Sequence, residues 1–293
     1  MKKLSFLSLV LGATLGATQT QAYQYQIDAG YDHHEIDDIA GLTTNAGDFN
    51  LQATAYFENI KTKNVPVQEA AFLSQTSNIY GAYAYSFTDI EATDNSAELN
   101  IDGHDFKGGF EYLNRQNGLY VNAEIGRSNT DLSLSGMGLT SEDTIHTTHY
   151  RALFGFMPQN NLLIAAGVQG YNATGEQKEA GLAARAKYVT ALGQKGQYLN
   201  LEANVNLNGM YKGIVPETDT YNAAADFYID PTWSIGSSYT FVDYGPEDTD
   251  SISIRTKKYF NQQVALGAEV TFGENIPTTE DETIYGIRGT YRF

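Results

Sequence analysis

The chain has 293 residues, of which 42% are hydrophobic, with a mean hydropathy of −0.36 and a formal net charge of −17. The negative charge argues against a nucleic-acid-binding protein, which needs a basic surface. The absence of cysteine excludes a disulfide scaffold, a thiolate metal site and a cysteine nucleophile. Beyond the first twenty residues there is no apolar run near the roughly 20 residues that a membrane helix needs, which excludes a helical membrane protein.

The start of the chain has the three regions of a signal peptide. Lys2 and Lys3 form a short basic region, residues 4–15 form an uncharged and mostly apolar stretch, and Thr20-Gln21-Ala22 resembles a cleavage site with small residues at both ends. We therefore expect residues 1–22 to be removed on export. Export of a chain without cysteine is expected to place it outside the inner membrane of a bacterium with two membranes.

After this segment, apolar and polar residues alternate in many short stretches. In one of them, from Phe49 to Phe57, apolar residues occupy every second position. A period of two with one apolar face is typical of a β-strand. We count about fourteen stretches of roughly ten residues, each long enough to cross an outer membrane at a tilt. They begin near Tyr23, Asp48, Ser77, His104, Gly118, His146, Leu162, Ala180, Gln197, Asp219, Trp233, Asp250, Gln263 and Asp281.

The connections between these stretches alternate in length. After even-numbered stretches most are tight and carry the Asn, Gly, Pro and Asp residues that turns use, as in residues 114–117 and 158–161. After odd-numbered stretches they are longer and polar, as in residues 33–47, 89–103 and 130–145. Short turns on one side and long loops on the other are typical of a bacterial outer-membrane barrel.

The pattern therefore predicts an all-β fold: an up-and-down, antiparallel transmembrane β-barrel of about 14 strands, formed by residues 23–293. Aromatic residues gather near the ends of the stretches, where they would form two girdles at the membrane interfaces. An even number of strands puts both termini on the short-turn, periplasmic side. The terminal Phe293 resembles the signal by which the barrel-assembly machinery recognises its clients. A soluble β-sandwich is the alternative, but it explains neither the loop asymmetry nor the signal peptide.

The phase of the alternation assigns charged residues to the lumen. Since a charge that faces lipid at mid-depth costs about 2–4 kcal/mol, charged residues on the phase opposite the apolar residues are expected to point into water. The predicted pore-lining residues are Lys107, Glu111, Glu124, Arg151, Arg185, Lys187, Glu202, Asp226, Arg255, Lys257, Glu269 and Arg288. Such a wall of mixed charge would orient polar solutes. The alternative is that these residues form salt bridges that only stiffen the wall.

One connection on the short-turn side is longer than the others. Residues 61–76 contain Pro66 and then an apolar-rich run that is compatible with a helix. A periplasmic segment folded into the lumen would bury such residues and narrow the pore, whereas a loose periplasmic turn would leave them exposed. The predicted constriction consists of Val67, Glu69, Phe72 and Leu73.

The long loops are rich in acidic residues, including Glu35, Asp89, Asp94 and Glu274. An acidic mouth attracts cations over about one Debye length, roughly 8–10 Å at ordinary salt. The alternative is that these charges only keep the loops solvated. No stretch has the spacing of a calcium loop, and we expect no metal site.

Two stretches resemble a known family. Residues 68–75 (QEAAFLSQ) and 184–189 (ARAKYV), with the mature start Tyr23-Gln24 and the closing Tyr291-Arg292-Phe293, are similar to the outer-membrane porin family of Acinetobacter-type bacteria. The resemblance implies a fourteen-stranded, monomeric channel for small solutes with a partly occluded lumen. It implies no catalytic residues and no cofactor. Such a barrel would contact outer-membrane lipid and lipopolysaccharide.

An enzyme and a purely structural or adhesion barrel are the competing hypotheses. His33 and His34 with Asp37 and Asp38 could be imagined as a hydrolytic site, but no nucleophile motif accompanies them. The loops are short for an adhesion head. We therefore expect a passive diffusion channel for small hydrophilic solutes rather than an adhesion barrel or an outer-membrane hydrolase.

Overall fold

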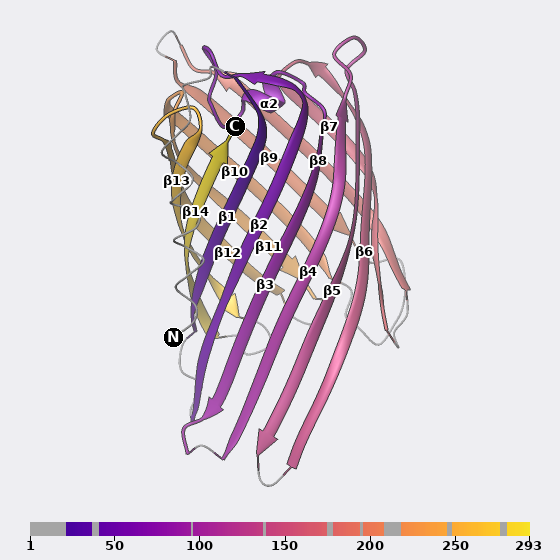
Figure 1. The fold of residues 1–293 in the computed structure, drawn as a ribbon, viewed down its shortest axis with the longest axis vertical. Helices are drawn as coiled ribbons and strands as arrows, with labels where there is room; N and C mark the ends of the chain where they lie inside the picture. Colours follow the sequence, from indigo (N-terminus) through magenta and orange to yellow (C-terminus); the bar gives the residue numbers. More distant parts are fainter. Residues whose placement is uncertain are drawn as a thin grey trace.

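The computed structural model describes residues 22–36, 41–94, 96–136, 139–174, 178–193, 196–207, 218–244, 248–275 and 280–293. Their strands form one closed antiparallel barrel in which consecutive strands pair and β1 pairs with β14 (Figure 1). The strands are β1 (Ala22–Ile36), β2 (Leu42–Lys61), β3 (Asn78–Ala92), β4 (Ala97–Leu113), β5 (Leu119–Gly136), β6 (Leu139–Gln159), β7 (Leu162–Ala173), β8 (Lys178–Ala191), β9 (Tyr198–Leu207), β10 (Asp219–Asp230), β11 (Trp233–Asp243), β12 (Asp248–Tyr259), β13 (Val264–Asn275) and β14 (Glu280–Arg292). A single-turn helix, α2 (Ala70–Leu73), lies between β2 and β3.

The predicted fold class, a fourteen-stranded up-and-down barrel, is confirmed. The expected signal peptide lies outside the described residues, apart from Ala22 at the start of β1. No helix within the described ranges is long and apolar enough to cross a membrane.

The outer face of the barrel is apolar. On β12, Ile252 and Ile254 are 49% and 56% exposed, whereas Ser253 between them is 8% exposed. Large exposed side chains follow the same phase on β6, where Phe154 and Phe156 flank the buried backbone of Gly155. The apolar side chains of the alternating pattern therefore face away from the interior. In a soluble protein they would face inward, whereas contact with lipid requires them on the outer face.

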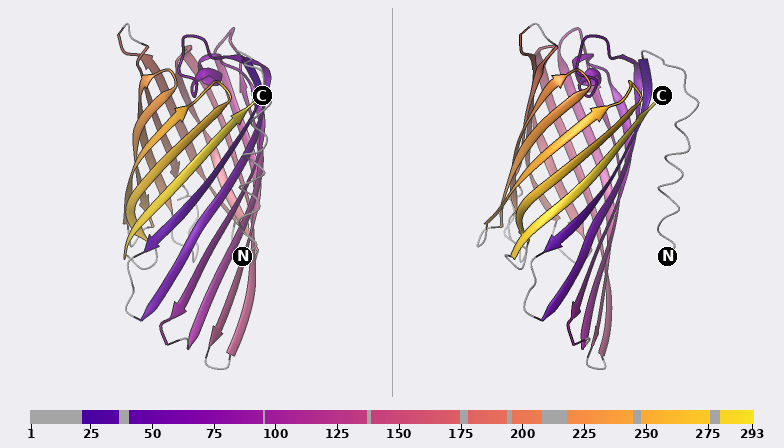
Figure 2. Two further views of the ribbon diagram at one scale, coloured as in Figure 1. Left: turned by 60° about the vertical axis from the view of Figure 1, so that its left-hand side comes forward. Right: turned by 90° about the vertical axis from the view of Figure 1, so that its left-hand side faces the viewer.

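The strands on one side of the barrel are longer than the predicted ten residues. β2 and β6 have 20 and 21 residues, and three regions expected to be long loops are mostly paired strand, as the pairs His34↔Ala46, Glu91↔Glu98 and Leu134↔Ser141 show. Figures 1 and 2 show these hairpins extending beyond the other strands. The predicted strand lengths were wrong on this side because the strands were recognised in the sequence by their apolar face. Backbone pairing does not need an apolar face, and it continues into regions where both faces of the sheet are polar.

Both ends of the described chain meet at the short-turn end of the barrel. The Gln24 and Tyr25 N–H groups donate to the Phe293 carbonyl at 3.0 and 2.9 Å, and the Tyr25 and Phe293 rings stack with centroids 5.4 Å apart. The barrel thus closes by joining its first strand to its last. In Figure 2, α2 lies inside this same end.

Candidate functional site

The connection between β2 and β3, residues 62–77, folds into the short-turn end of the barrel; we call it the inner segment. Its backbone bonds to the wall at widely separated points. The Val67 N–H donates to the Pro231 carbonyl at 2.8 Å, the Arg292 Nη1 donates to the Val67 carbonyl at 2.8 Å, and the Tyr198 hydroxyl donates to the Asn64 carbonyl at 2.8 Å. Because these partners belong to β14, β9 and the β10–β11 turn, the inner segment crosses the interior at this end.

Local conformation explains how so short a segment can turn back on itself. Asn64 and Gln75, one near each end, adopt left-handed backbone conformations with φ of 62° and 49°. The Gln75 N–H donates to the Phe72 carbonyl at 2.9 Å, and this residue ends α2 as left-handed residues commonly end helices. The Gln75 side chain then reaches Asn160 in the β6–β7 turn, with 3.5 Å between Nε2 and Oδ1.

Glu69 is the most deeply buried charge of the inner segment. It is 2% exposed, and its Oε2 lies 2.8 Å from the Lys187 Nζ on β8. Its Oε1 accepts a hydrogen bond from the Tyr228 hydroxyl on β10 at 2.7 Å. A buried carboxylate is tolerated only when it is paired and hydrogen-bonded, and both oxygens of Glu69 meet that condition.

The apolar residues of the inner segment pack against different parts of the wall. Val67 is 3% exposed and clusters with Tyr259 and Ala265. Phe72 packs on the buried cluster around Tyr120, and the Lys187 Nζ lies 5.2 Å from the Phe72 ring centroid. Leu73 is only partly buried. The four residues expected to form a constriction are therefore brought together at one end of the lumen, and their effect on the pore remains a prediction.

Ion pairs connect most of the predicted pore-lining residues. Arg185 on β8 is the centre of the largest group, with 3.1 Å to Glu111 on β4 and 3.1 Å to Glu202 on β9. Since β4 and β8 are not neighbours, the Arg185–Glu111 contact is made through the interior. The remaining pairs are Lys107–Glu124 at 3.6 Å, Lys187–Glu202 at 3.5 Å, Arg255–Asp226 at 2.8 Å, Lys257–Asp28 at 3.9 Å and Arg288–Asp32 at 2.7 Å.

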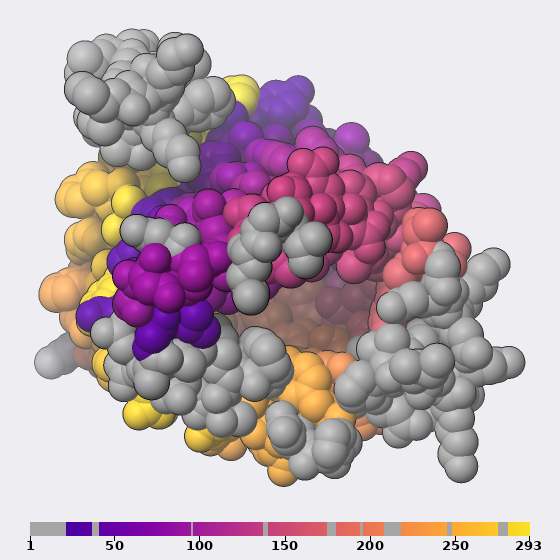
Figure 3. Space-filling view, turned by 90° about the horizontal axis from the view of Figure 1, so that it is seen from below, coloured from indigo at the N-terminus to yellow at the C-terminus, as the bar shows by residue number. Residues whose placement is uncertain are grey.

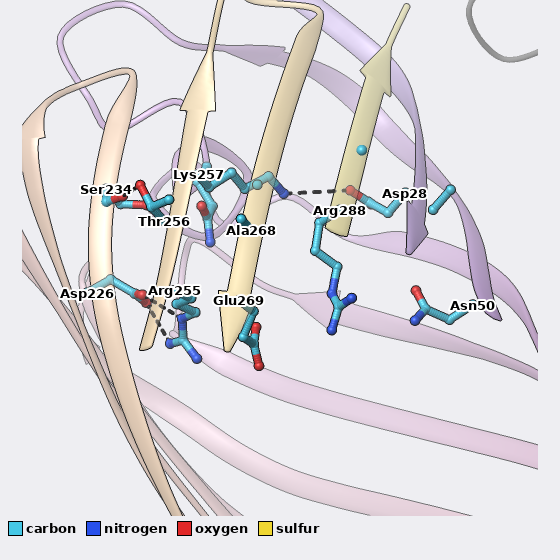
Figure 4. A pocket seen from close by; sticks show the side chains of 14 residues that line it. Asp28, Asn50, Asp226, Ser234, Arg255, Thr256, Lys257, Ala268, Glu269 and Arg288 are labelled. Carbon is cyan, nitrogen blue, oxygen red and sulfur yellow. Dashed lines mark hydrogen bonds and ion pairs between the residues drawn. The ribbon is translucent and has the colours of Figure 1, made fainter. Parts of the chain in front are cut away.

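A cavity of about 200 Å³ lies against the wall formed by β10 to β14 and β1 (Figure 4). Arg255, Lys257, Glu269 and Arg288 line it, and the inner segment contributes Gln68. In Figure 4 the charged side chains come from adjacent strands and converge on this space, with Arg255 held by Asp226.

A second cavity, of about 250 Å³, is lined by residues of β1 to β6 and β8. Its lining includes Glu111, Glu124, Arg151 and Arg185 among polar residues such as Gln52. Arg151 and Glu269 are the two predicted pore-lining residues that form no hydrogen bond or ion pair within the described part of the chain. Arg151 lines the second cavity and Glu269 lines the first, and whether solutes pass over any of these residues remains a prediction.

Several interior residues were absent from the predicted set. Asp28 and Asp32 on β1 and Tyr228 on β10 lie on the inward phase of their strands, so the same phase rule could have found them. Arg292 lies on the phase that the alternation assigns to the lumen, and it has no acidic partner within 4 Å among the described residues; its guanidinium carbon lies 4.3 and 4.7 Å from the ring centroids of Tyr23 and Tyr259. No sequence signal indicates such an aromatic clamp.

The long-loop end is hollow when viewed from that side (Figure 3). Near this end the imidazole of His34 lies between two acids, 2.8 Å from Asp48 and 2.6 Å from Glu282. His33 faces outward, so the two histidines do not share a site; Asp37 and Asp38 lie outside the described residues.

At the β3–β4 tip, hydrogen bonds from Ser96 hold the pKa of Asp94 below its usual value, so that this acid stays charged. Among the described residues, no group of three or more histidine or acidic side chains could hold a metal ion.

Comparison with known proteins decides the family. Residues 1–293 match the model of a family described as "Putative general bacterial porin". The chain belongs to this porin family. No curated protein matches it. Among solved structures it resembles Omp33 of Acinetobacter baumannii, with a TM-score of 0.61 and 18% identity over 94% of this chain and 100% of that one.

A second structural match is a deletion mutant of TodX, a monoaromatic hydrocarbon channel. It has a TM-score of 0.57 and 8% identity over 94% of this chain and 91% of that one. At such low identities these likenesses concern the fold alone. Together with the family they identify the protein as a porin of the bacterial outer membrane.

Proposed function

We propose that this porin is a passive diffusion channel for small hydrophilic solutes and that the inner segment partly occludes its lumen. The observation that carries the proposal is the burial of Glu69 between Lys187 and Tyr228. The inner segment joins β2 to β3, whereas the residues that hold Glu69 belong to β8 and β10 on the other side of the barrel. The segment is therefore attached across the pore and does not lie only along the wall next to β2 and β3. Only solutes that pass this segment, or that displace it, would cross the membrane.

The charged lumen supports hydrophilic rather than apolar cargo. Six basic side chains on the inward phase form ion pairs with interior acids, and such groups keep a pore filled with water. Apolar solutes gain nothing from such a wall, whereas polar solutes exchange their hydration shell for hydrogen bonds.

We also propose that the barrel is not an enzyme and that it works as a monomer. His33 and His34, the candidate hydrolytic residues, project to opposite faces of β1. The exposed apolar belt that includes Phe154, Ile254 and Leu266 would contact outer-membrane lipid, with lipopolysaccharide in the outer leaflet. The exposed ring of Phe293 at the end of β14 would be recognised by the barrel-assembly machinery.

Planar bilayer recording of the purified porin tests the proposal. We expect conductance steps that are small and brief, because ions must pass beside the inner segment or wait until it is displaced. Conductance that is large and continuously open would argue against occlusion. Silence accompanied by hydrolysis of lipid or peptide would argue for an enzyme, and silence without hydrolysis for a structural barrel.

A further inference from the structure

Two opposite charges that line the same cavity, the one in Figure 4, have no hydrogen-bond partner in the wall. Glu269 on β13 forms no ion pair or hydrogen bond with any other described residue. The ammonium of Lys257 on β12 forms no hydrogen bond within the described part of the chain, since Asp28, its ion-pair partner, lies 3.9 Å from the Nζ. Charged groups in a protein interior are normally hydrogen-bonded, so this cavity offers a free donor and a free acceptor.

Asp28 does not depend on Lys257. The Thr290 hydroxyl donates to the Asp28 Oδ1 at 2.6 Å, and the Gln26 Nε2 donates to the Asp28 Oδ2 at 2.6 Å. Both carboxylate oxygens therefore have donors that are closer than the Lys257 Nζ. Since an ammonium carries three donors, Lys257 can turn them toward a solute and leave Asp28 satisfied.

The bases nearest to Glu269 are engaged elsewhere. Arg255 is its cross-strand neighbour but donates to Asp226 through Nε and Nη2, at 2.8 and 3.1 Å. Arg288 donates to Asp32 at 2.7 Å. In Figure 4 the Glu269 carboxylate enters the cavity without a dashed line to any neighbour. Each arginine is neutralised by its own acid, so the charge of Glu269 is left for a cationic group.

The strand register puts the two charges next to each other on one wall. β12 and β13 are paired, and Lys257 stands opposite Gly267, two residues before Glu269 on β13. Such diagonal neighbours lie about 7–8 Å apart in a sheet. Both side chains are on the inward phase, because the preceding residues, Thr256 and Ala268, are exposed on the outer face. A small solute can therefore contact both residues without spanning the lumen.

The cavity leaves room for such a solute. Its volume of about 200 Å³ is more than ten times the roughly 10–15 Å³ that one water molecule needs. Gly267 keeps the floor open, because a Cβ there would lie 3.6 Å from the Lys257 Cβ and 3.5 Å from the Arg288 Cβ. Figure 4 shows Lys257 reaching across β13 and Glu269 projecting from it, so that both end groups border the same space.

We propose that this cavity is a binding site for small zwitterionic α-amino acids, with the carboxylate on Lys257 and the ammonium on Glu269. An α-amino acid carries both charges close together, as the adjacent positions of the two residues require. The inner segment adds an acceptor, because the Gln68 Oε1 is buried, unpaired and belongs to a residue that lines the cavity. This site rests on the proposed function as a channel and names its preferred cargo.

Nuclear magnetic resonance titration of the purified porin in detergent tests the site without requiring conduction. The probes are L-alanine, which has both charges, N-acetyl-L-alanine, which has only the carboxylate, and L-alaninamide, which has only the ammonium. We expect L-alanine to bind at least about tenfold more tightly than either single-charge probe, because each charge-assisted contact contributes separately. Equal affinity for the three probes, or no binding of L-alanine, would overturn the proposal.

Single substitutions then assign each charge of the solute to its residue. Lys257→Met should weaken L-alanine and N-acetyl-L-alanine about tenfold and should not weaken L-alaninamide. Glu269→Gln should weaken L-alanine and L-alaninamide by a similar factor and should not weaken N-acetyl-L-alanine. The matched controls are Lys61→Met and Glu274→Gln, which remove the same charges from exposed positions outside the cavity. Losses no larger than those of the controls would contradict the assignment.

Two features of this design keep the outcomes separate. The comparison of probes uses the native barrel, so it decides the question even if a variant does not fold. If Lys257 and Glu269 only pair with each other, the native barrel will show no preference for L-alanine, and the inference fails. Bilayer conductance of the same preparation tests the channel itself. Conductance without a preference for L-alanine defeats this inference alone, and preferential binding without conductance defeats the proposed function alone.

Discussion

The Nζ of Lys187 on β8 lies 2.8 Å from the Oε2 of Glu69, a residue of the inner segment that is 2% exposed. The ion pair joins two parts of the chain 118 positions apart by number and attaches the inner segment to the far wall. Breaking a buried ion pair by removing one partner costs about 3–5 kcal/mol, since the other charge is left uncompensated. The pair is therefore strong enough to decide whether the inner segment stays in place.

Lys187→Met should loosen the inner segment. With Lys187 gone, Glu69 keeps the Tyr228 hydroxyl but has no cation within 4 Å among the described residues, so the docked state loses about 3–5 kcal/mol. We expect a marked rise in the fraction of time spent conducting, measured by single-channel recording. Lys63→Met is the control, because Lys63 belongs to the same segment and is exposed. Identical opening fractions for both variants would show that the pair does not hold the segment.

Arg292→Met should destabilise the barrel where it closes. The guanidinium lies over the rings of Tyr23 and Tyr259 and donates to Gln26 at 2.6 Å and to the Val67 carbonyl at 2.8 Å. Leaving these acceptors buried without a donor costs roughly 1–3 kcal/mol. The temperature at which the folded form is lost in detergent should fall for this variant and not for Lys61→Met, an exposed control. An unchanged temperature would mean that the aromatic clamp contributes little.

Cysteine labelling should separate the two faces of the wall. Since the native chain has no cysteine, each introduced thiol reports one position. A polar reagent that does not cross membranes should label Arg255→Cys and Arg288→Cys in intact membranes and leave Leu201→Cys and Leu266→Cys unlabelled. The opposite pattern would invert the assignment of lumen and lipid faces.

The acidic long-loop end should favour cations. Its interior acids include Asp48 and Glu282 beside His34, and Asp94 remains charged at the β3–β4 tip. Reversal potentials under a salt gradient should show a modest cation preference that weakens as salt rises, because screening shortens the reach of the loop charges. A clear anion preference would mean that Arg151 and the other lumen bases dominate.

The fold could be predicted because lipid imposes a simple rule on every strand. Side chains that face lipid, such as Ile252 and Leu266, must be apolar. The alternate positions of each strand must then face the lumen, and charged residues such as Arg185 and Lys257 occupy them. Strand ends could not be predicted from that rule. Outside the membrane neither face needs to be apolar, so the pairs Glu91↔Glu98 and Leu134↔Ser141 carry no alternation that marks them as strand.

The inner segment could be predicted in part. Its length and apolar residues pointed to it, but the partners of Glu69 could not be known, because they depend on how Lys187 and Tyr228 are brought together by the closed barrel. The same is true of the unpaired charges. Arg151 and Glu269 look in the sequence like the other inward charges, and only the three-dimensional pairing of their neighbours sets them apart.

Single-channel conductance of a variant without the inner segment tests the occluded channel most directly. Replacing residues 64–75 with an Asn-Gly turn joins β2 to β3 by a tight connection of the kind that closes hairpins. The barrel should remain folded, as judged by its resistance to detergent at room temperature, and its conductance should rise severalfold with long openings in place of brief ones. A folded variant whose conductance and open times equal those of the full chain would contradict the account, because it would show that the inner segment does not restrict the pore.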